Sequence, residues 1–249
     1  MPTERKMRMP RFFVPGTIAD AVSLIGEDAA HVARSLRMTP GETLTLCDGA
    51  GTDYLCVITS VAPDEIQLRV ERSEPSRSEP DVAVTLFQGL PKGEKMEWII
   101  QKAVELGAAR IVPYLAARSI SRPDSAAAKK KAQRWQKIAD EAAKQSQRGS
   151  LPRVDAPVSF EQAVREAFGC GQVLLLYEGG GRPLRELLPE KLRNLALFVG
   201  PEGGFDPDEV ATLQSLGAGV VTLGNRILRT ETAPLAALAA VMYATGNLE

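Results

Sequence analysis

The sequence predicts an α/β protein with a small, mostly β module at the N-terminus and a larger domain built on a parallel sheet. Short runs of strand type come first, followed by a polar stretch with two prolines, RSEPSRSEP (72–80), in which the tetrapeptide R-S-E-P occurs twice. Beyond it, apolar strands alternate with helical segments, a pattern typical of a parallel sheet covered by helices. We therefore predict domains over residues 1–74 and 81–249, joined by a linker over 75–80.

Three runs in the first domain predict strands, and one predicts a helix. The strands are ETLTLC (42–47), DYLCVITS (53–60) and EIQLRVE (65–71), separated by the turn-rich stretches DGAGT and APD. The helical run is DAAHVARSL (28–36).

In the second domain, five apolar runs predict buried strands, over residues 82–88, 110–114, 172–177, 194–199 and 219–223. Helical periodicity predicts helices over residues 95–106, 129–148 and 206–217. The last of these opens with Asp206 and Glu209 in capping-box spacing and closes at Gly217. Trp98 and Trp135 fall on the first two helices, where core packing is expected rather than base stacking.

Positive charge is concentrated although the net charge is only −1. Residues 118–148 carry nine Lys and Arg against three acids, and residues 1–11 carry Arg5, Lys6, Arg8 and Arg11 against Glu4. Such clusters fit an anionic partner. A solvated helix face is the alternative explanation for KKKAQRWQK (129–137).

Several classes of protein are disfavoured. The N-terminal residues have no apolar segment of signal-peptide type, and the apolar run 233–244 is short for a bilayer and contains Pro234. Three cysteines, an odd number without C-x-x-C spacing, argue against a disulfide framework and a zinc site. A single histidine and the absence of phosphate-loop and dinucleotide motifs disfavour triad hydrolases and nucleotide enzymes. We expect a cytoplasmic protein without a membrane segment or a metal.

Three predicted strands end in glycine-rich stretches, YEGGG (177–181), GPEGG (200–204) and LGN (223–225). Ligands of parallel sheets bind beyond the carboxyl ends of the strands, and glycine lets the backbone approach them closely. The expected site is therefore built mainly of backbone, with acidic and basic side chains nearby. It suits a ligand with an adenine edge and a positive charge.

A polar cluster, RTET (229–232), precedes the last helix. Thr232 is the expected N-cap, with Pro234 in the first turn. The helix itself is apolar on nearly every side, which predicts burial in a core or an interface. Capping requires one threonine, so the rest of the cluster needs a functional explanation.

The stretches FVGPEGGFDPDEV (198–210) and LGNRILRTETAPLAALAAV (223–241) resemble the ribosomal RNA small subunit methyltransferase E family. That family belongs to the SPOUT class of S-adenosylmethionine-dependent RNA methyltransferases. Four further stretches resemble family segments in the same order: PRFFV (10–14), HVARSLRMTPGETLTLCDGAG (31–51), QGLPKGEKMEWIIQKAVELGAARIVPY (88–114) and RWQKIADEAAKQSQR (134–148).

The resemblance implies a PUA-like RNA-binding β-barrel domain followed by a SPOUT α/β domain with a deep trefoil knot. Because chains rarely thread themselves, the knot follows from the resemblance alone. The resemblance also implies a homodimer with the cofactor pocket beside the interface, which would bury the apolar last helix.

The resemblance further implies S-adenosylmethionine bound in a bent pose by three loops, Leu176–Gly179, Phe198–Gly204 and Leu223–Ala233. The cofactor-binding residues that it implies are Leu176, Tyr177, Glu178, Gly179, Phe198, Val199, Gly200, Pro201, Glu202, Gly203, Leu223, Gly224, Ile227, Leu228, Thr230, Thr232 and Ala233.

The implied reaction is methylation of N3 of a uridine in 16S ribosomal RNA within the small ribosomal subunit. Uracil N3–H is a weak acid, so a residue must take its proton or stabilise the resulting anion. We expect Arg229 to stabilise the anion and Glu231 to act as base, with stabilisation of the helix dipole as the alternative role of Glu231. The expected RNA contacts are Arg11, Arg34, Arg37, Lys92, Lys95, Arg118 and Arg148.

Two other functions remain open from the sequence. One is a SPOUT methyltransferase that acts on another RNA or another base. The other is a non-catalytic RNA-binding or ribosome-assembly factor, against which the intact GPEGG and LRTETA stretches argue. A nucleotide-dependent metabolic enzyme is a more distant third.

Overall fold

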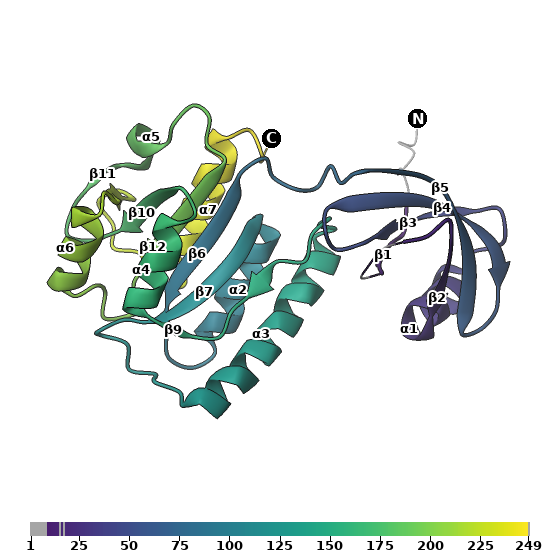
Figure 1. The fold of residues 1–249 in the computed structure, drawn as a ribbon, viewed down its shortest axis with the longest axis horizontal. Helices are drawn as coiled ribbons and strands as arrows, with labels where there is room; N and C mark the ends of the chain where they lie inside the picture. The colour runs from purple at the N-terminus through teal and green to yellow at the C-terminus, as the bar shows by residue number, and fades with distance from the viewer. Residues whose placement is uncertain (1–8, 15, 17, 249) are drawn as a thin grey trace. The chain divides into compact units, whose positions relative to one another are not determined.

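The computed structural model describes residues 9–14, 16 and 18–248. Arg5, Lys6 and Arg8 of the expected basic cluster lie outside the described residues. The chain divides into two compact units, one made of residues 1–79 with 147–151 and the other of residues 80–146 and 152–249 (Figure 1).

The first unit contains a five-stranded sheet with the order β1-β3-β4-β5-β2. Its strands are β1 (Arg11–Phe13), β2 (Ala21–Ile25), β3 (Thr43–Cys47), β4 (Thr52–Val61) and β5 (Glu65–Pro75). The three predicted strands are confirmed as β3, β4 and β5. The short strands β1 and β2 were not expected, because three to five residues carry little periodicity.

The stretch 72–80 is not a linker throughout. Strand β5 continues to Pro75, and Arg72, Ser73 and Glu74 pair with Leu55, Tyr54 and Asp53 of β4. Ladder hydrogen bonds come from the backbone, so a polar run forms a strand once a partner strand lies beside it.

Alternate residues of β3, β4 and β5 form the core of the first unit, with Leu44, Leu46, Ile58, Ile66 and Leu68 almost fully buried. The predicted helix at 28–36 consists of a short α-helix, α1 (Gly26–Ala30), and a π-helical turn (His31–Leu36). Ala29 and Val32 from these turns complete the core.

The segment 147–151 leaves the second unit and joins the first. It follows α3 (Ser125–Gln145), which ends three residues before the predicted end at 148, because Gln147 has a φ of 59°. Gly51 N–H donates to the Gly149 carbonyl, and Leu151 N–H donates to the Gly49 carbonyl, both at 3.0 Å.

The second unit is built on an eight-stranded sheet with the order β11-β13-β10-β12-β6-β7-β8, and β9 also pairs with β7. Every strand pair in it is parallel, which confirms the predicted fold class. The strands are β6 (Ala83–Gly89), β7 (Ala108–Leu115), β8 (Arg153–Val154), β9 (Val158–Ser159), β10 (Gln172–Leu176), β11 (Arg182–Pro183), β12 (Asn194–Val199) and β13 (Gly219–Thr222).

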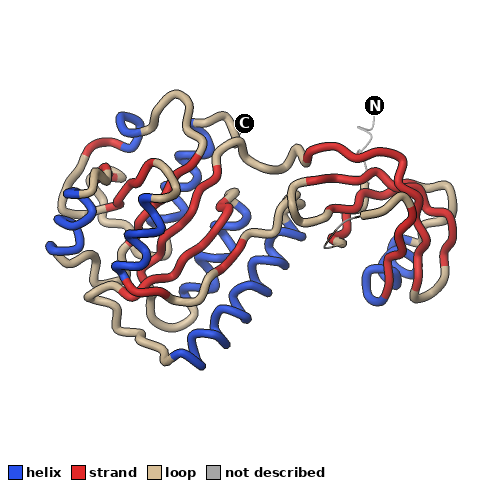
Figure 2. The backbone as a smooth tube through the Cα atoms, viewed as in Figure 1, coloured by secondary structure: helices blue, strands red, loops and turns tan. Residues whose placement is uncertain are grey.

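Helices cover both faces of this sheet, as Figures 1 and 2 show. On one face, α4 (Phe160–Phe168) and α6 (Pro207–Ser215) pack on a core that includes the stacked rings of Phe87 and Phe198. On the other, α2 (Lys95–Glu105) packs against α3 and α7 (Ala233–Ala244). The short α5 (Leu184–Leu187) lies beside β11 and β13. No helix in the described part of the chain is long and apolar enough to cross a membrane.

Local predictions on these helices had mixed outcomes. The capping box of Asp206 and Glu209 is present at the start of α6. Thr232 occupies the N-cap position of α7, but its side chain makes no capping hydrogen bond. Trp135 is buried as predicted, whereas Trp98 is 54% exposed because its position on α2 lies away from the sheet.

Glu79 attaches the segment 147–151 to the rest of the first unit. Its carboxylate accepts hydrogen bonds from the Arg148 guanidinium at 2.6 and 3.2 Å, from Gly149 N–H at 2.7 Å and from Ser150 N–H at 3.1 Å. Burial by itself would raise the pKa of Glu79, but its hydrogen bonds and the charge of Arg148 outweigh burial and lower it.

We predict that Glu79→Ala destabilises the first unit by about 3–5 kcal/mol, because it leaves the buried Arg148 charge without its carboxylate. The readout is hydrogen exchange at the Gly51 and Leu151 amides. Since the folded pKa of Glu79 is lowered, its contribution is complete above its ordinary pKa of 4.5 and is lost as the pH falls through the folded value. Asp64→Ala, which breaks an exposed ion pair with Arg34, is the control and should change little. Equal rates of hydrogen exchange in the Glu79→Ala and Asp64→Ala variants would show that Glu79 does not hold the segment 147–151 in place.

Candidate cofactor site

The carboxyl ends of four neighbouring strands, β13, β10, β12 and β6, meet at one edge of the second unit's sheet. Because all these strands are parallel, the loops that follow them converge at this edge. A pocket of about 690 Å³ opens among these loops, a size typical of cofactor sites.

The pocket brings together the three loops predicted from the sequence. The predicted cofactor residues that line it are Leu176, Tyr177, Glu178, Val199, Gly200, Pro201, Glu202, Gly203, Leu223, Gly224, Ile227, Leu228, Thr230 and Ala233. Arg229 and Glu231 also line it. The lining further includes Gly204, Asn225 and Arg226 from within the predicted loops, and Val221 and Thr222 from β13.

Three residues implied for the cofactor lie outside this lining, namely Gly179, Phe198 and Thr232. Phe198 is fully buried and stacks on Phe87 at a centroid distance of 4.8 Å, so it is a core residue. Its side chain points into the sheet's core because neighbouring residues of a strand alternate between the two faces.

Two glycines allow the loop 200–204 to take its path. A Cβ atom on Gly89, at the end of β6, would lie 2.6 Å from the Pro201 ring and backbone nitrogen. Gly204 has a φ of +68°, and a Cβ there would lie 2.4 Å from the Glu178 carboxylate. A side chain at Gly89 would displace the backbone of Pro201, and a side chain at Gly204 would adopt a strained backbone conformation and meet the Glu178 carboxylate.

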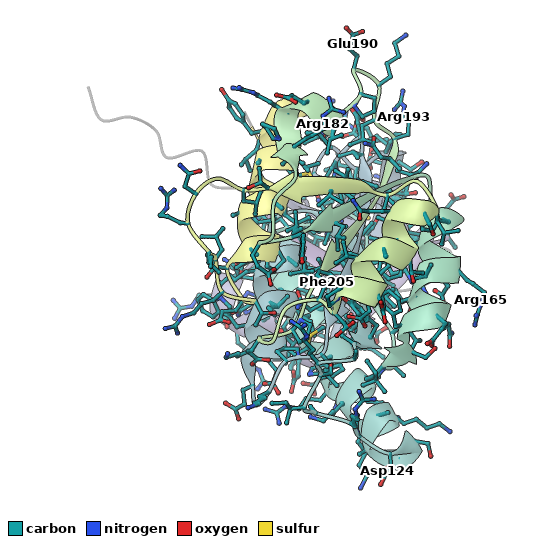
Figure 3. All side chains as sticks on the ribbon, turned by 90° about the vertical axis from the view of Figure 1, so that its left-hand side faces the viewer. Asp124, Arg165, Arg182, Glu190, Arg193 and Phe205 are labelled. Atoms are coloured by element: carbon teal, nitrogen blue, oxygen red, sulfur yellow. The ribbon has the colours of Figure 1, made fainter. Side chains whose placement is uncertain are left out.

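Phe205 anchors the far end of this loop. It is 1% exposed and belongs to the core beneath α6, and Figure 3 shows it in the middle of the unit, whereas the labelled Arg165 projects outward. The loop thus runs from one buried aromatic residue, Phe198, to another.

Buried side chains satisfy the loop's first carbonyl groups. The Tyr114 hydroxyl donates to the Val199 carbonyl at 3.1 Å, and the Thr230 hydroxyl donates to the Gly200 carbonyl at 2.7 Å. Thr230 therefore holds the loop 223–233 against the loop 200–204, which explains one polar residue of the cluster that capping left unexplained.

A charged cluster lies at the side of the pocket. Lys95 Nζ is 3.0 Å from Glu202 Oε1 and 3.6 Å from Glu231 Oε2. Glu202 also accepts from Lys92 N–H at 3.1 Å. The hydrogen bond between Lys95 and Glu202 raises the pKa of Lys95. Burial by itself would raise the pKa of Glu202, but hydrogen bonds from Lys95 and from the backbone outweigh burial and lower it. Lys95, predicted as an RNA contact, is thus part of the pocket.

Glu231 and Arg229 have contrasting environments. Glu231 Oε2 is buried and has no hydrogen-bond partner among the described residues. Glu231 precedes the N-cap Thr232, so it lies outside the first turn of α7. Arg229 is exposed and makes no ion pair with any residue that the structure describes. Arg229 is therefore available to a ligand in the pocket, whereas Glu231 meets such a ligand as the ion-pair partner of Lys95.

Two residues predicted as RNA contacts, Arg148 and Arg11, make ion pairs within the first unit. Arg148 is 4% exposed and paired with Glu79. Arg11, whose side chain is 13% exposed, contacts Asp53 at 2.5 Å and the Ser76 hydroxyl at 3.1 Å. Both residues stabilise the first unit.

The other basic candidates are accessible. Arg34, within the π-helical turn, and Arg37, at its C-terminal end, are exposed on the first unit. On the second unit, Lys92 is exposed, and Arg118 donates to the Gly203 carbonyl at 3.1 Å, at the rim of the pocket.

The pocket fits S-adenosylmethionine in size and charge. Its wall offers backbone groups suited to an adenine edge, and its charged lining consists of Lys95, Arg226, Arg229, Glu178, Glu202 and Glu231. Equal numbers of acids and bases suit a ligand that carries both a cationic centre and a carboxylate. Glu231 Oε2, which makes no hydrogen bond among the described residues, is a further acceptor that a ligand could satisfy. Within the described ranges, no group of three or more His, Cys, Asp or Glu residues is arranged to hold a metal ion.

Profiles of two known domain families match the chain. The RNA methyltransferase domain matches residues 78–242, and the RNA methyltransferase PUA domain matches residues 24–71.

Curated relatives match over nearly their whole length. A ribosomal RNA small subunit methyltransferase E from Bacillus subtilis is 39% identical over 95% of this chain and 97% of the relative. The enzyme of the same name from Mycobacterium tuberculosis is 39% identical over 94% of this chain and 90% of the relative.

Solved structures agree with these matches. A ribosomal RNA small subunit methyltransferase E from Neisseria gonorrhoeae, bound to S-adenosylmethionine, is 32% identical with a TM-score of 0.81, covering 94% of this chain and 97% of that one. A methyltransferase structure from Legionella pneumophila with bound S-adenosylmethionine is 33% identical with a TM-score of 0.79, covering 95% and 98%. The PUA domain and the methyltransferase domain together cover most of the chain, and the Bacillus subtilis enzyme is 39% identical over 95% of it. This chain therefore belongs to the ribosomal RNA small subunit methyltransferase E family.

Proposed function

We propose that this protein transfers a methyl group from S-adenosylmethionine to N3 of a specific uridine in 16S ribosomal RNA of the small ribosomal subunit. The observation that carries the proposal is the pocket in which three glycine-rich loops meet Arg229 and Glu231. Its substrate is a ribosomal subunit, so we place the enzyme in the cytoplasm.

The three loops hold the cofactor in this proposal. Backbone groups of residues 199–204 and 223–228 read the adenine, and Glu178 and Glu202 compensate positive charge. Bound S-adenosylmethionine supplies the electrophilic methyl group. The apolar residues Leu176 and Leu228 line the pocket and limit the access of water to the reacting atoms.

Arg229 and Glu231 act on the uridine in this proposal. N3 becomes nucleophilic when it loses its proton, and the charge then spreads to the two neighbouring carbonyl oxygens. Arg229, exposed and without an ion pair among the described residues, stabilises that charge. Glu231, whose buried Oε2 makes no hydrogen bond among the described residues and lies 3.6 Å from Lys95 Nζ, accepts the proton. Its place before the N-cap argues against the alternative role at the helix dipole.

Phosphate contacts supply most of the affinity for RNA. We propose Arg34 and Arg37 on the first unit and Lys92 and Arg118 on the second as the basic residues that make them, since all four are exposed. Lys95 acts instead on Glu202 and Glu231. The trefoil knot stays a prediction from the family resemblance.

We also propose that the protein forms a homodimer through α2 and α7. Pro234, Ala237, Leu238, Val241 and Met242 of α7 are buried within the unit. The opposite side of α7 carries Tyr243, 68% exposed, and α2 beside it carries Trp98, 54% exposed. Helix α7 has no charged residue, which is unusual for a helix face left in water.

Methyl transfer to small ribosomal subunits that lack base methylation tests the function. With labelled S-adenosylmethionine, we expect one label per subunit and one new reverse-transcription stop at a uridine, because a methyl group on N3 blocks base pairing. Label at another nucleotide would show that the protein is a methyltransferase with a different target. RNA binding without cofactor binding would instead support an assembly factor.

Substitutions separate the proposed catalytic roles from cofactor binding. Arg229→Ala should lower kcat by ~10²–10³-fold, the usual effect of removing a donor to a developing oxyanion, with little change in the Kd for S-adenosylmethionine. Glu231→Gln should lower kcat by ~10²–10⁴-fold if the carboxylate is the base. Arg165→Ala, at an exposed arginine of α4 that lies outside the pocket lining, is the matched control. A variant that keeps the wild-type kcat would contradict the catalytic role proposed for the residue that it replaces.

The dimer is tested by the mass in solution. We expect sedimentation equilibrium to give twice the mass of one chain, and Tyr243→Glu to weaken association at least about tenfold, because a carboxylate would be buried without a partner. Ile120→Glu changes another apolar side chain that is 70% exposed and lies on neither helix, so it should leave the mass unchanged. A wild-type monomer, or dissociation of both variants alike, would refute this interface.

A further inference from the structure

Gln88 is a buried glutamine that lies behind the pocket and outside its lining. It is the last side chain of β6 before Gly89, at the edge where the three cofactor loops meet. It is fully buried among strands whose other core residues are almost all apolar. A buried amide in such a place needs an explanation.

The Gln88 amide nitrogen lies among three acceptors that belong to three different segments. Nε2 is 3.0 Å from the Gly89 carbonyl oxygen on β6, 3.0 Å from Thr230 Oγ1 and 3.4 Å from the Gly200 carbonyl oxygen. Two backbone carbonyls face this end of the amide, so it must be the NH₂ end, because an amide oxygen here would meet two other oxygens.

This donor also determines where the Thr230 hydroxyl points. The hydroxyl has one hydrogen, which it donates to the Gly200 carbonyl at 2.7 Å. Nε2 donates to the same hydroxyl oxygen and so occupies one of its acceptor positions. With that position filled by a donor, the hydroxyl hydrogen points to Gly200, and the two cofactor loops are joined.

The amide oxygen of Gln88 makes no hydrogen bond comparable to those of the amide nitrogen. Gln88 Oε1 is buried and lacks a hydrogen-bond partner among the residues that the structure describes. An unsatisfied buried acceptor lowers stability. A glutamine that served stability alone would use both ends, whereas only the donor end of Gln88 is used. Sites that sacrifice stability in this way are expected where function requires a defined geometry.

We propose that Gln88 is a positioning residue for cofactor binding, which sets the Thr230 hydroxyl and thereby the spacing between loops 200–204 and 223–233. Gln88 itself does not contact the cofactor. The inference rests on the proposed function, in that this pocket is the one that takes S-adenosylmethionine.

Gln88→Met is the decisive variant, because methionine has a similar length and removes both the donor and the unsatisfied oxygen. We expect the Kd for S-adenosylmethionine, measured by isothermal titration calorimetry, to rise at least about tenfold, or 1.4 kcal/mol. The midpoint of thermal unfolding should fall by no more than roughly 2–4 °C, since loss of the orphaned oxygen offsets loss of the donor.

Thr230→Val removes the hydroxyl through which Gln88 acts. The Gln88→Met/Thr230→Val double variant should therefore bind the cofactor no more weakly than Thr230→Val alone. Additive losses would show that Gln88 acts by another route and would overturn the proposal.

Gln136→Met is the matched control in the same unit. Gln136 uses both ends of its amide, donating to the Pro152 carbonyl at 2.9 Å and accepting from Val154 N–H at 2.8 Å, and it is not part of the pocket. We expect this variant to lower the unfolding midpoint and to leave the Kd unchanged. A variant that changes the Kd with little change in the unfolding midpoint identifies a positioning residue, whereas a variant that changes only the midpoint identifies a structural one.

Two results would count against the proposal in distinguishable ways. If the wild-type protein binds S-adenosylmethionine and Gln88→Met binds it within about twofold, Gln88 is no positioning residue while the proposed function stands. If the wild-type protein does not bind it, the proposed function fails. Hydrogen exchange without ligand then decides the positioning role: faster exchange at the Gly203 and Gly204 amides in Gln88→Met, but not in Gln136→Met, supports it, and unchanged exchange refutes it.

Discussion

The carbonyl groups of Val199 and Gly200 impose the constraint on which the site depends. They lie at the point where the chain leaves the sheet, next to the buried end of β6, and buried backbone groups must find hydrogen-bond partners. The partners here are side chains, the Tyr114 and Thr230 hydroxyls. Tyr114 on β7 and Thr230 in the loop before α7 therefore fix the path of the loop 200–204. Because Gly89 has no side chain, the backbone of Pro201 can lie against the end of β6.

The same constraint explains the polar cluster before α7. Thr230 joins two loops, Glu231 faces the pocket beside Lys95, and Arg229 remains accessible. Capping accounts for none of the three, and even Thr232 holds the N-cap position without a side-chain hydrogen bond. The helix that follows can be apolar because the polar groups that the site requires are all placed ahead of it.

Charge in this protein has two separate uses. Some basic residues are structural, such as the buried Arg148 with Glu79 and the half-buried Arg11 with Asp53. Others are exposed, such as Arg37 and Lys92, and are accessible to an anionic polymer. Since both kinds contribute equally to a local charge sum, the basic clusters in the sequence overstate the surface that RNA could contact.

The sequence by itself determined the five central strands of the parallel sheet, the capping box of α6 and the glycine-rich strand ends, because hydrophobic periodicity and turn chemistry are local. The family motifs also placed most of the pocket lining. Only the tertiary structure decided which side chains have free groups. It paired Arg11 with Asp53 and Arg148 with Glu79, placed Lys95 in the pocket, exposed Trp98 and brought Gln88 to Thr230, 142 positions away. A polar residue at the end of the apolar run VAVTLFQ was the one local sign of Gln88's role. Such partnerships depend on residues far apart in the chain, and no local pattern records them.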